Sequence, residues 1–477
     1  MTDPDLSADD FAAALARAAR MAERYLRELP TREAFRRPPD NVVERFRDAP
    51  LPQTGIPSDE ILADIECDVL PYSLGIGHPR WWGFIRPSPV PLGMAADLLS
   101  ATMNNNCSGS AQIATYVEMT VVRWLAELLG YDPHAGGLLM SGGSAANFVA
   151  LSAMRETLLP GTRTGGLRGL EREPAIYVTR ETHSCIRRAV EMLGLGSDAL
   201  RFVPVDAALR MDADALAEMV AADRARGAVP LAVVATAGTV NTGAIDPLER
   251  IAEIARDESL WYHVDGAYGG VGAALPELAE LYRGLALADS IAIDPHKWLY
   301  VPYEAGAVLV RERDALQRAF ATKASYLEVG EDDYFNGPLW FHQQGPQLSR
   351  GFRALKVWAV MRQIGVAGYR ALWRKDIAAA TELRRLVTAH PQLEALGTSP
   401  LSICCFRYVP ERGDADLFNR RLLNRIQVDG RVFVSGTTVH DQFCLRACIV
   451  NFHTTPGDVR LAVEAIVELG EKLEGKD

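Results

Sequence analysis

The sequence is poor in the features that mark secreted, disulfide-linked and membrane proteins. Its seven cysteines form no C-x-x-C pair, and the adjacent Cys404 and Cys405 stand in an apolar run typical of a strand. Such cysteines indicate buried thiols in a reducing compartment. No apolar run is long enough to span a bilayer, and the N-terminus is acidic and then amphipathic, unlike a secretory signal. We therefore expect a cytoplasmic protein without a membrane partner.

Long runs of one charge and the common metal and nucleotide motifs are also missing. The chain carries 50 basic and 61 acidic side chains, a net charge of −11, which argues against nucleic acid or an anionic membrane as a partner. It contains no G-x-x-x-x-G-K-[ST] loop, no H-E-x-x-H motif and no metal-like grouping of its nine histidines. We expect no metal in the site.

Length and hydrophobic patterning indicate a globular protein with two or more lobes. The 477 residues exceed one ordinary domain and suffice for a large core. Between residues 175 and 311 strand patterns alternate with helical ones, which predicts an α/β fold with a mostly parallel sheet covered by helices and a ligand beyond the strand ends. The strands are predicted at 175–178, 202–205, 231–236, 261–264, 290–293 and 306–310, and the helices at about 183–194, 213–227, 247–257 and 275–285.

One short apolar run stops at Asp294-Pro295 and presents His296 and Lys297. This pattern predicts a buried strand with a lysine at its end. Burial beside apolar neighbours lowers the pKa of a lysine, which frees the amine to attack a carbonyl and form a Schiff base. The alternative is a surface lysine after a turn, and residues upstream decide between the two.

Three upstream groups supply the other parts that a pyridoxal phosphate site needs. Asp265 ends a predicted strand, where a carboxylate keeps a pyridine nitrogen protonated, and the small Ala267 lets a ring lie flat. Gly143 and Ser144 open a segment of helical composition, whose backbone N–H groups and hydroxyl bind a phosphate. His183, at the start of another helix, could stack on the ring. Each signal alone also fits an ordinary structural residue, so their consistent order favours the site.

At these residues the sequence resembles the group II pyridoxal-phosphate-dependent amino acid decarboxylases, which include the aromatic L-amino acid, histidine and glutamate decarboxylases. The Pro295-His-Lys-Trp298 core, His263-Val-Asp265 and His78-Pro79 appear in family order, and the resemblance runs from about Phe11 to about Glu468. It implies pyridoxal 5′-phosphate as the cofactor, held by Lys297, on the fold type I architecture.

The resemblance also implies a homodimer with the active site at the subunit interface, because the family's N-terminal segment wraps over the partner subunit. Residues 8–28 do show helical apolar spacing, although such a helix could pack only on its own chain.

We expect an N-terminal helical segment at 1–85, a large cofactor-binding domain at 86–375 and a smaller C-terminal α+β domain at 376–477. The remaining predictions are a connector at 38–57, helices at 61–70, 414–426 and 456–472, one from beyond 349 to about 390, and strands near 403–409 and 444–450.

A loop with several aromatic side chains is the candidate substrate wall. In the family this segment lines the substrate site, whereas an aromatic cluster in a loop more often serves packing. Its arginine could attract an acidic substrate side chain or face solvent. The candidate residues are Trp81, Trp82, Phe84, Ile85 and Arg86.

Residues 321–347 show little periodicity and predict a long lid. In the family a lid tyrosine follows the Schiff-base lysine by about thirty residues and protonates Cα after CO2 leaves, and counting along the chain places Tyr326 there. Relatives that oxidise instead carry phenylalanine at this position. The resemblance further implies that His183 and Ala267 stack on the two cofactor faces and that His296 assists proton transfer.

Three residues depart from the family pattern. Asp294 stands where many relatives have an asparagine near the phosphate, so its carboxyl must be protonated or turned away. Val240 follows Thr239, an implied cofactor contact, where a second threonine is common. Ser349 occupies a position that is glycine in many aromatic decarboxylases and can be serine in histidine decarboxylases. These departures leave the substrate open and keep the cofactor assignment.

The resemblance implies decarboxylation of an L-amino acid to the amine and CO2, with an aromatic substrate preferred because of the aromatic loop. An acidic substrate held by Arg80 or Arg86 is the nearest rival, and histidine is the third. An aminotransferase or a decarboxylation-dependent oxidase is disfavoured because Tyr326 and its lid are present. A non-enzymatic binding module has no use for Lys297 and Asp265 together.

Overall fold

The computed structural model describes residues 6–322, 330 and 332–475. Its α-helices are α1 Ala8–Glu28, α2 Asp40–Arg47, α3 Ser58–Asp64, α4 Pro91–Met103, α5 Ile113–Leu128, α6 Gly143–Leu158, α7 Thr162–Gly165, α8 Ser184–Met192, α9 Ala213–Ala225, α10 Leu248–Asp257, α11 Arg313–Phe320, α12 Arg353–Ala389, α13 Ala415–Asp429 and α14 Pro456–Glu474. Its strands are β1 Gly136–Met140, β2 Pro174–Val178, β3 Leu200–Phe202, β4 Val229–Thr236, β5 Trp261–Asp265, β6 Ser290–Ile293, β7 Gly306–Val310, β8 Leu393–Leu396, β9 Ile403–Tyr408, β10 Ser435–Val439 and β11 Gln442–Cys448.

Seven strands form the central sheet in the order β1-β7-β6-β5-β4-β2-β3. β7 is antiparallel to both of its neighbours, and the pairs from β6 through to β3 are parallel. The predicted mostly parallel sheet is therefore confirmed. Because β1 and β6 are both antiparallel to β7, the carboxyl ends of β1, β4, β5 and β6 meet at one edge of the sheet, where ligands bind in such folds.

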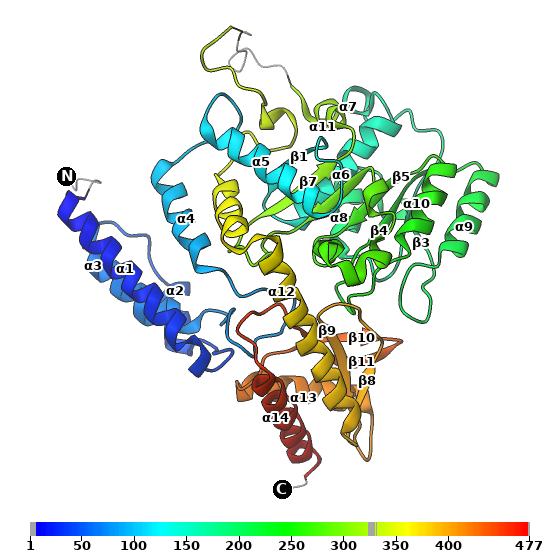
Figure 1. The fold of residues 1–477 in the computed structure, drawn as a ribbon. Coiled ribbons are helices and arrows are strands. Elements are labelled where there is room, and N and C mark those ends of the chain that lie inside the picture. The colour runs from blue at the N-terminus through cyan, green and yellow to red at the C-terminus, as the bar shows by residue number, and fades with distance from the viewer. Residues whose placement is uncertain (1–5, 323–329, 331, 476–477) are drawn as a thin grey trace.

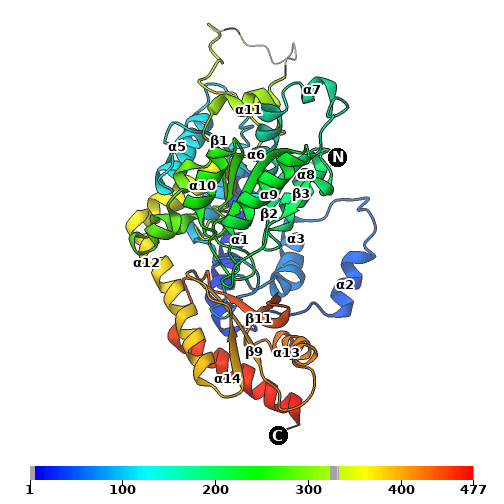
Figure 2. The same ribbon diagram turned by 90° about the vertical axis from the view of Figure 1, so that its right-hand side faces the viewer.

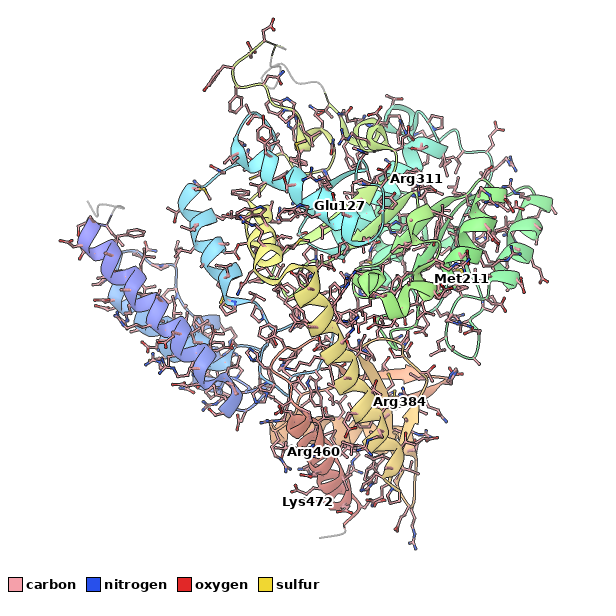
Figure 3. The ribbon with its side chains drawn as sticks, in the orientation of Figure 1. Glu127, Met211, Arg311, Arg384, Arg460 and Lys472 are labelled. Atoms are coloured by element: carbon pink, nitrogen blue, oxygen red, sulfur yellow. The ribbon has the colours of Figure 1, made fainter. Side chains whose placement is uncertain are left out.

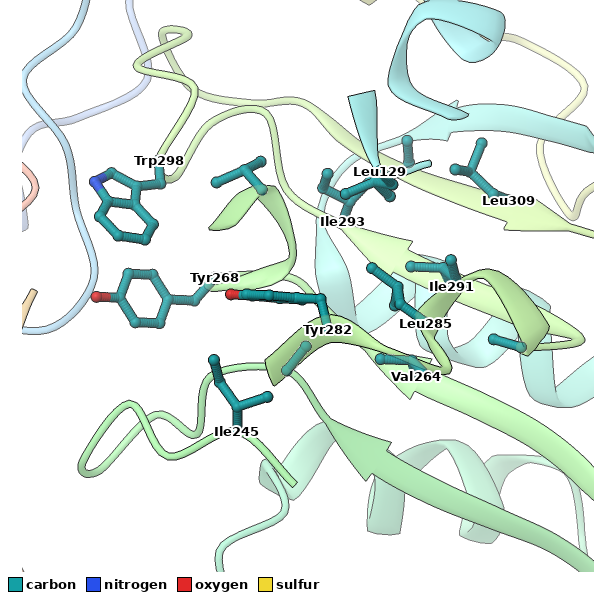
Figure 4. Close-up of a cluster of buried hydrophobic side chains, with 14 of the residues drawn as sticks. Leu129, Ile245, Val264, Tyr268, Tyr282, Leu285, Ile291, Ile293, Trp298 and Leu309 are labelled. Atoms are coloured by element: carbon teal, nitrogen blue, oxygen red, sulfur yellow. The ribbon is translucent and has the colours of Figure 1, made fainter. Parts of the chain in front are cut away.

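Helices cover both faces of this sheet (Figure 1). Successive strand residues point to opposite faces, so Val233 and Ala235 of β4 join an apolar cluster with α5, α9, α10 and α12. Ala232 and Val234 join a second cluster with α6, α8 and α11. Figure 4 shows part of the first cluster, where Val264 and Ile291 extend from neighbouring strands. These two apolar layers hold the strand ends in fixed positions.

A second sheet of four antiparallel strands, in the order β10-β11-β9-β8, forms the smaller lobe. α13, α14 and the end of α12 pack on it in a separate apolar cluster. Arg460 and Lys472 of α14 are exposed on the outside of this lobe (Figure 3). Figures 1 and 2 show α12 running from the large sheet down to the small one. Because α12 spans the expected boundary at 375–376, the division into three domains stays a prediction.

The N-terminal helices α1, α2 and α3 lie beside α4 and away from the large sheet (Figure 1). α1 begins as predicted, with the Ser7 side chain accepting a hydrogen bond from the Asp10 N–H. The expected connector contains α2, whose first turn carries Asp40 at the positive end of the helix dipole. The helix predicted at 61–70 is α3 followed by a π-helical turn at Ile65–Val69.

Several predicted elements differ from those observed. The strand expected at 202–205 is β3, at Leu200–Phe202. In place of the helix expected at 275–285, the chain forms a 3₁₀-helix at Pro276–Tyr282. This helix ends early because the chain leaves helical geometry at Arg283 and turns at Gly284, where φ is 91°. The sequence patterns did not identify β1, β8 or β10 as strands.

Candidate active site

A cavity of about 480 Å³ lies at the carboxyl edge of the large sheet. Asp265 closes β5, Lys297 follows β6, and Gly143 begins α6 just after β1. Strand ends therefore bring together residues that are far apart in sequence. The predicted residues that line the cavity are Phe84, Ile85, Gly143, Ser144, His183, Asp265, Ala267, Asp294, His296 and Lys297.

Lys297 reaches the cavity as an ion pair, with Nζ 2.9 Å from Oδ2 of Asp294. Burial acts to lower the pKa of this amine, but the carboxylates of Asp294 and Asp265 outweigh it, so the pKa of Lys297 is raised. The expectation that burial lowers the pKa of this lysine is therefore corrected. In this state the amine is held as an ammonium and must lose a proton before it can attack a carbonyl.

Asp294 is buried, and its two oxygens have different surroundings. Oδ2 faces Lys297, whereas Oδ1 has no hydrogen-bond partner among the described residues. A Cβ added at Gly143 would lie 2.8 Å from Oδ2, and one added at Gly306 would lie 2.7 Å from Oδ1. Glycine at both positions lets the backbone approach this carboxyl closely. Pairing with Lys297 is thus a third option beside the protonated and turned-away states expected for Asp294.

Asp265 is 6% exposed and has a partner for each oxygen. Oδ1 accepts a hydrogen bond from the Ala267 N–H at 3.1 Å, and Oδ2 accepts one from Asn147 Nδ2 at 3.3 Å. The two hydrogen bonds hold this side chain in one orientation. The structure therefore presents a fixed carboxylate at the base of the cavity.

Two histidines border the cavity from different elements. His183 precedes α8, where its Nδ1 accepts a hydrogen bond from the Cys185 N–H at 3.2 Å. Desolvation by its surroundings lowers the pKa of His183, although the Asp265 carboxylate acts in the other direction. His296 is 7% exposed, accepts a hydrogen bond from the Ala305 N–H, and has its pKa lowered by burial. Both imidazoles are thus neutral near pH 7.

The start of α6 forms the part of the cavity suited to an anion. Gly142 precedes the helix, Gly143 and Ser144 form its first turn, and all three line the cavity. The Gly142 carbonyl accepts hydrogen bonds from Ala145 and Ala146, while no such bond occupies the N–H groups of Gly143 and Ser144 in the described residues. Free N–H groups at a helix start bind phosphate through hydrogen bonds and the helix dipole.

The aromatic loop divides between the core and the cavity. Trp81 and Trp82 are each 1% exposed. Trp81 stacks on Phe433 at 4.9 Å between ring centroids, and Trp82 belongs to the apolar cluster of the small lobe. The two indoles therefore serve packing, and Phe84 and Ile85 form this part of the cavity wall.

Two other predicted residues, Thr239 and Arg86, are not among the residues that line the cavity. The hydroxyl of Thr239 lies 3.1 Å from that of Thr242 and accepts a hydrogen bond from the Ala244 N–H, so it is engaged within its own loop. Val240 and Thr236 line the cavity instead. Tyr326 lies outside the described residues.

The structure adds polar groups that the sequence patterns did not single out. Asn147 and Cys185 line the cavity. Asn147 lies four residues after Gly143, on the same face of α6, and this spacing could have identified it. Arg446 of the small lobe donates to the carbonyls of Phe84 and Asn241, and its buried Nη2 has no partner among the described residues. Arg446 gave no local signal, because only the docking of the two lobes places it there.

The described residues contain neither a candidate metal site nor a candidate membrane helix. No group of three or more His, Cys, Asp or Glu side chains in the described ranges could hold a metal ion. Within the same ranges, no helix is long and apolar enough to cross a membrane.

Comparison with known proteins decides between the uses that this cavity permits. Residues 39–409 match the pyridoxal-dependent decarboxylase conserved domain. The chain belongs to the pyridoxal-dependent decarboxylase family. It is 31% identical to aromatic-L-amino-acid decarboxylase of Sus scrofa, over 95% of each chain, and 30% identical to that of Bacillus atrophaeus, over 89% of this chain and 88% of the other. The structure of Oryza sativa TDC with PLP and tryptamine matches with a TM-score of 0.92 and 28% identity, covering 99% of this chain and 100% of that one.

The residues of this decarboxylase fit its cofactor, pyridoxal phosphate. The described cavity offers an amine at Lys297, a doubly hydrogen-bonded carboxylate at Asp265 and a helix start at Gly143. These are the groups needed for a carbonyl, a pyridine nitrogen and a phosphate. A Cβ at Gly143 would lie 3.2 Å from that of Ala267 as well as close to Asp294, so glycine keeps this part of the cavity open.

Proposed function

We propose that this decarboxylase converts an aromatic L-amino acid to its amine and CO2. The observation that carries the proposal is one cavity that combines Lys297 and Asp265 with a wall of Phe84 and Ile85. A phenyl ring and a branched alkyl group suit an apolar substrate side chain. The names of the compared relatives, two aromatic-L-amino-acid decarboxylases, support the same substrate class.

The proposed division of labour follows from what each side chain can donate or accept. When bound, pyridoxal phosphate supplies the electron sink for the electron pair left at Cα as CO2 departs. Lys297 would hold the cofactor through its amine, and Asp265 would hold a proton at the ring nitrogen. The N–H groups of Gly143 and Ser144 would bind the phosphate, and His183 and Ala267 would contact the ring.

Proton return to Cα is the step that separates amine production from oxidation. We assign it to Tyr326, with His296 assisting, because Tyr326 follows Lys297 at the family spacing. His296 supports this assignment by position: it lines the cavity, and its ring centroid lies 4.5 Å from that of Tyr303.

An acidic amino acid is the second candidate substrate, and Arg86 favours it. The Arg86 guanidinium lies over the rings of Phe84 and Trp81, at 5.1 and 5.9 Å, and has no acidic partner among the described residues. Arg80, the other candidate, is already paired with Asp458 at 2.6 Å. Only Arg86 of the two is therefore available to a substrate carboxylate.

We also propose a cytoplasmic homodimer with the active site at the subunit interface. Buried free thiols at six of the seven cysteines support a reducing compartment. Large apolar side chains on α4 and at the start of α5 are exposed in the single chain and support a partner surface. They include Leu98, Leu99, Met103 and Ile113.

A substrate comparison tests the proposal. We expect L-tryptophan, L-tyrosine or L-phenylalanine to give a higher kcat/KM than L-glutamate in the unchanged enzyme, and Arg86→Ala to leave that order intact. A preference for L-glutamate that Arg86→Ala abolishes would instead establish the acidic substrate.

A further inference from the structure

A line of buried polar side chains runs from Asp265 into the apolar layer beneath α6. Asn147 Nδ2 lies 3.3 Å from Asp265 Oδ2, and Asn147 Oδ1 lies 2.6 Å from His263 Nε2. His263 Nδ1 lies 2.8 Å from Ser290 Oγ, which is 2.8 Å from Trp261 Nε1. Asn147, His263 and Ser290 have no exposed surface.

The donors in this line all point the same way. Asn147 Nδ2 donates to Asp265, so Asn147 Oδ1 is turned toward His263 and accepts from its Nε2–H. Nδ1 of His263 is then the acceptor for the Ser290 hydroxyl, and Trp261, whose indole N–H can only donate, donates to Ser290 Oγ. Burial lowers the pKa of His263 to about 4, so its imidazole is neutral and can play both parts. One donor-only end and one acceptor end fix every group between them.

Every hydrogen-bonding group of the Asn147 side chain has a partner. Its carbonyl accepts from His263, one amide hydrogen goes to Asp265, and the other is directed to Cys185 Sγ at 3.3 Å. If the amide were flipped, its N–H group would face the N–H of His263, and its oxygen would face the oxygen of Asp265. Each mismatch would cost the free energy of an unmade buried hydrogen bond.

Polar side chains are an energetically unfavourable way to fill the apolar layer beneath α6. Trp261, His263 and Asp265 alternate along β5 and so share the face covered by α6. The buried side chains packed around this line include the apolar Ala146 and Val149. Burying an amide, an imidazole and a hydroxyl among them stabilises the fold less than apolar side chains of similar size would.

We propose that Asn147 is a positioning residue for Asp265, and that the line Trp261–Ser290–His263–Asn147 fixes the Asp265 carboxylate to hold a proton on the pyridine nitrogen of the cofactor. This inference rests on the proposed role of Asp265. Because each link orients the next, the influence on Asp265 declines with distance: Asn147 affects it most, Ser290 less and Trp261 least.

Cofactor binding to the full-length protein tests the proposal independently of any substrate. We expect Asn147→Ala to weaken the binding of pyridoxal phosphate about tenfold to a hundredfold, the effect of losing one hydrogen bond to a charged group. The ¹⁵N signal of the labelled pyridine nitrogen should move toward its unprotonated position. Ser290→Ala should produce smaller changes of the same kind, and Trp261→Phe the smallest.

Asn419→Ala is the matched control. Asn419 has no exposed surface and is fully hydrogen-bonded, but it lies on α13 and binds the backbone of Tyr408. It should lower the thermal unfolding midpoint and leave cofactor affinity and the ¹⁵N signal unchanged.

Equal effects of Asn147→Ala and Asn419→Ala on both cofactor readouts would overturn the inference, as would a ¹⁵N signal unmoved in Asn147→Ala. If Asn147→Ala does not fold, Ser290→Ala decides by the same two readouts, and no change in either contradicts the inference. An enzyme inactive on aromatic amino acids whose variants still follow the expected order supports this inference and refutes only the proposed substrate.

Discussion

Lys297 forms an ion pair with the buried carboxylate of Asp294. Asp294 raises the pKa of the Lys297 amine against the effect of burial. Covalent attachment of the cofactor at Nζ would alter this ion pair, and the start of α6 at Gly143 lies close to the same carboxyl.

The first prediction concerns Lys297 directly. Lys297→Ala should abolish turnover, because no other amine lines the described cavity. Borohydride treatment of the cofactor-loaded, unchanged enzyme should attach the cofactor to the peptide that contains Lys297, as read by mass spectrometry. Attachment at a different lysine would refute the assignment.

The second prediction concerns Tyr326. Tyr326→Phe removes the proposed proton donor and keeps the ring, so in aerated buffer dioxygen should take up the electron pair left at Cα, and the product should change from amine to aldehyde, ammonia and peroxide. The measurement is the amine yield per CO2 released. An unchanged yield would show that another group returns the proton.

At the scale of the elements, α12 carries a buried carboxyl that connects the lobes. Asp376 accepts hydrogen bonds from Trp298 Nε1 at 2.9 Å, from Tyr300 at 2.6 Å and from the Asn451 N–H at 3.3 Å. Trp298 and Tyr300 follow Lys297 directly, and Asn451 follows β11. Burial raises the pKa of Asp376 to about 7, against the effect of these hydrogen bonds.

This shift predicts how stability depends on pH. An unfolded aspartate has a pKa of about 3.9, so between about pH 4 and pH 7 the folded chain keeps a proton that the unfolded chain has lost. Raising the pH through this window therefore lowers the contribution of Asp376 to stability, and above it the contribution is constant. The free energy of unfolding of the unchanged protein minus that of Asp376→Asn should fall across the window in denaturant titrations. A difference independent of pH would contradict the assignment.

Some of the strands could be predicted from sequence patterns and others could not. β6 was predictable because its β-branched run ends at Asp294-Pro295, and β5 because a short apolar run ends at Asp265-Gly266; the family motifs then placed Asp265 and Lys297 at these strand ends. The short β1 contains two glycines and gave no such signal. Trp81 and Trp82 were expected in the wall because local sequence shows an aromatic cluster without showing that Phe433 and the small lobe cover it.

At the scale of the whole molecule, one chain leaves an apolar surface on α4 and α5 uncovered. Leu99 is 58% exposed and Ile113 is 67% exposed. We expect the protein to migrate at twice its chain mass of 52.2 kDa, and Leu99→Asp with Ile113→Asp to yield monomers with little activity. Val428→Asp is the control, since Val428 is 83% exposed on α13. Monomeric behaviour of the unchanged protein would refute the dimer.

The central claim is that this chain releases CO2 from an aromatic L-amino acid and returns a proton to Cα. Its most direct test is to incubate the cofactor-loaded enzyme with a panel of L-amino acids and to quantify CO2, amine and peroxide for each. We expect CO2 to be released fastest from an aromatic substrate, with an equal amount of amine formed and no peroxide. Peroxide and aldehyde in place of amine, or no CO2 from any aromatic substrate, would contradict it.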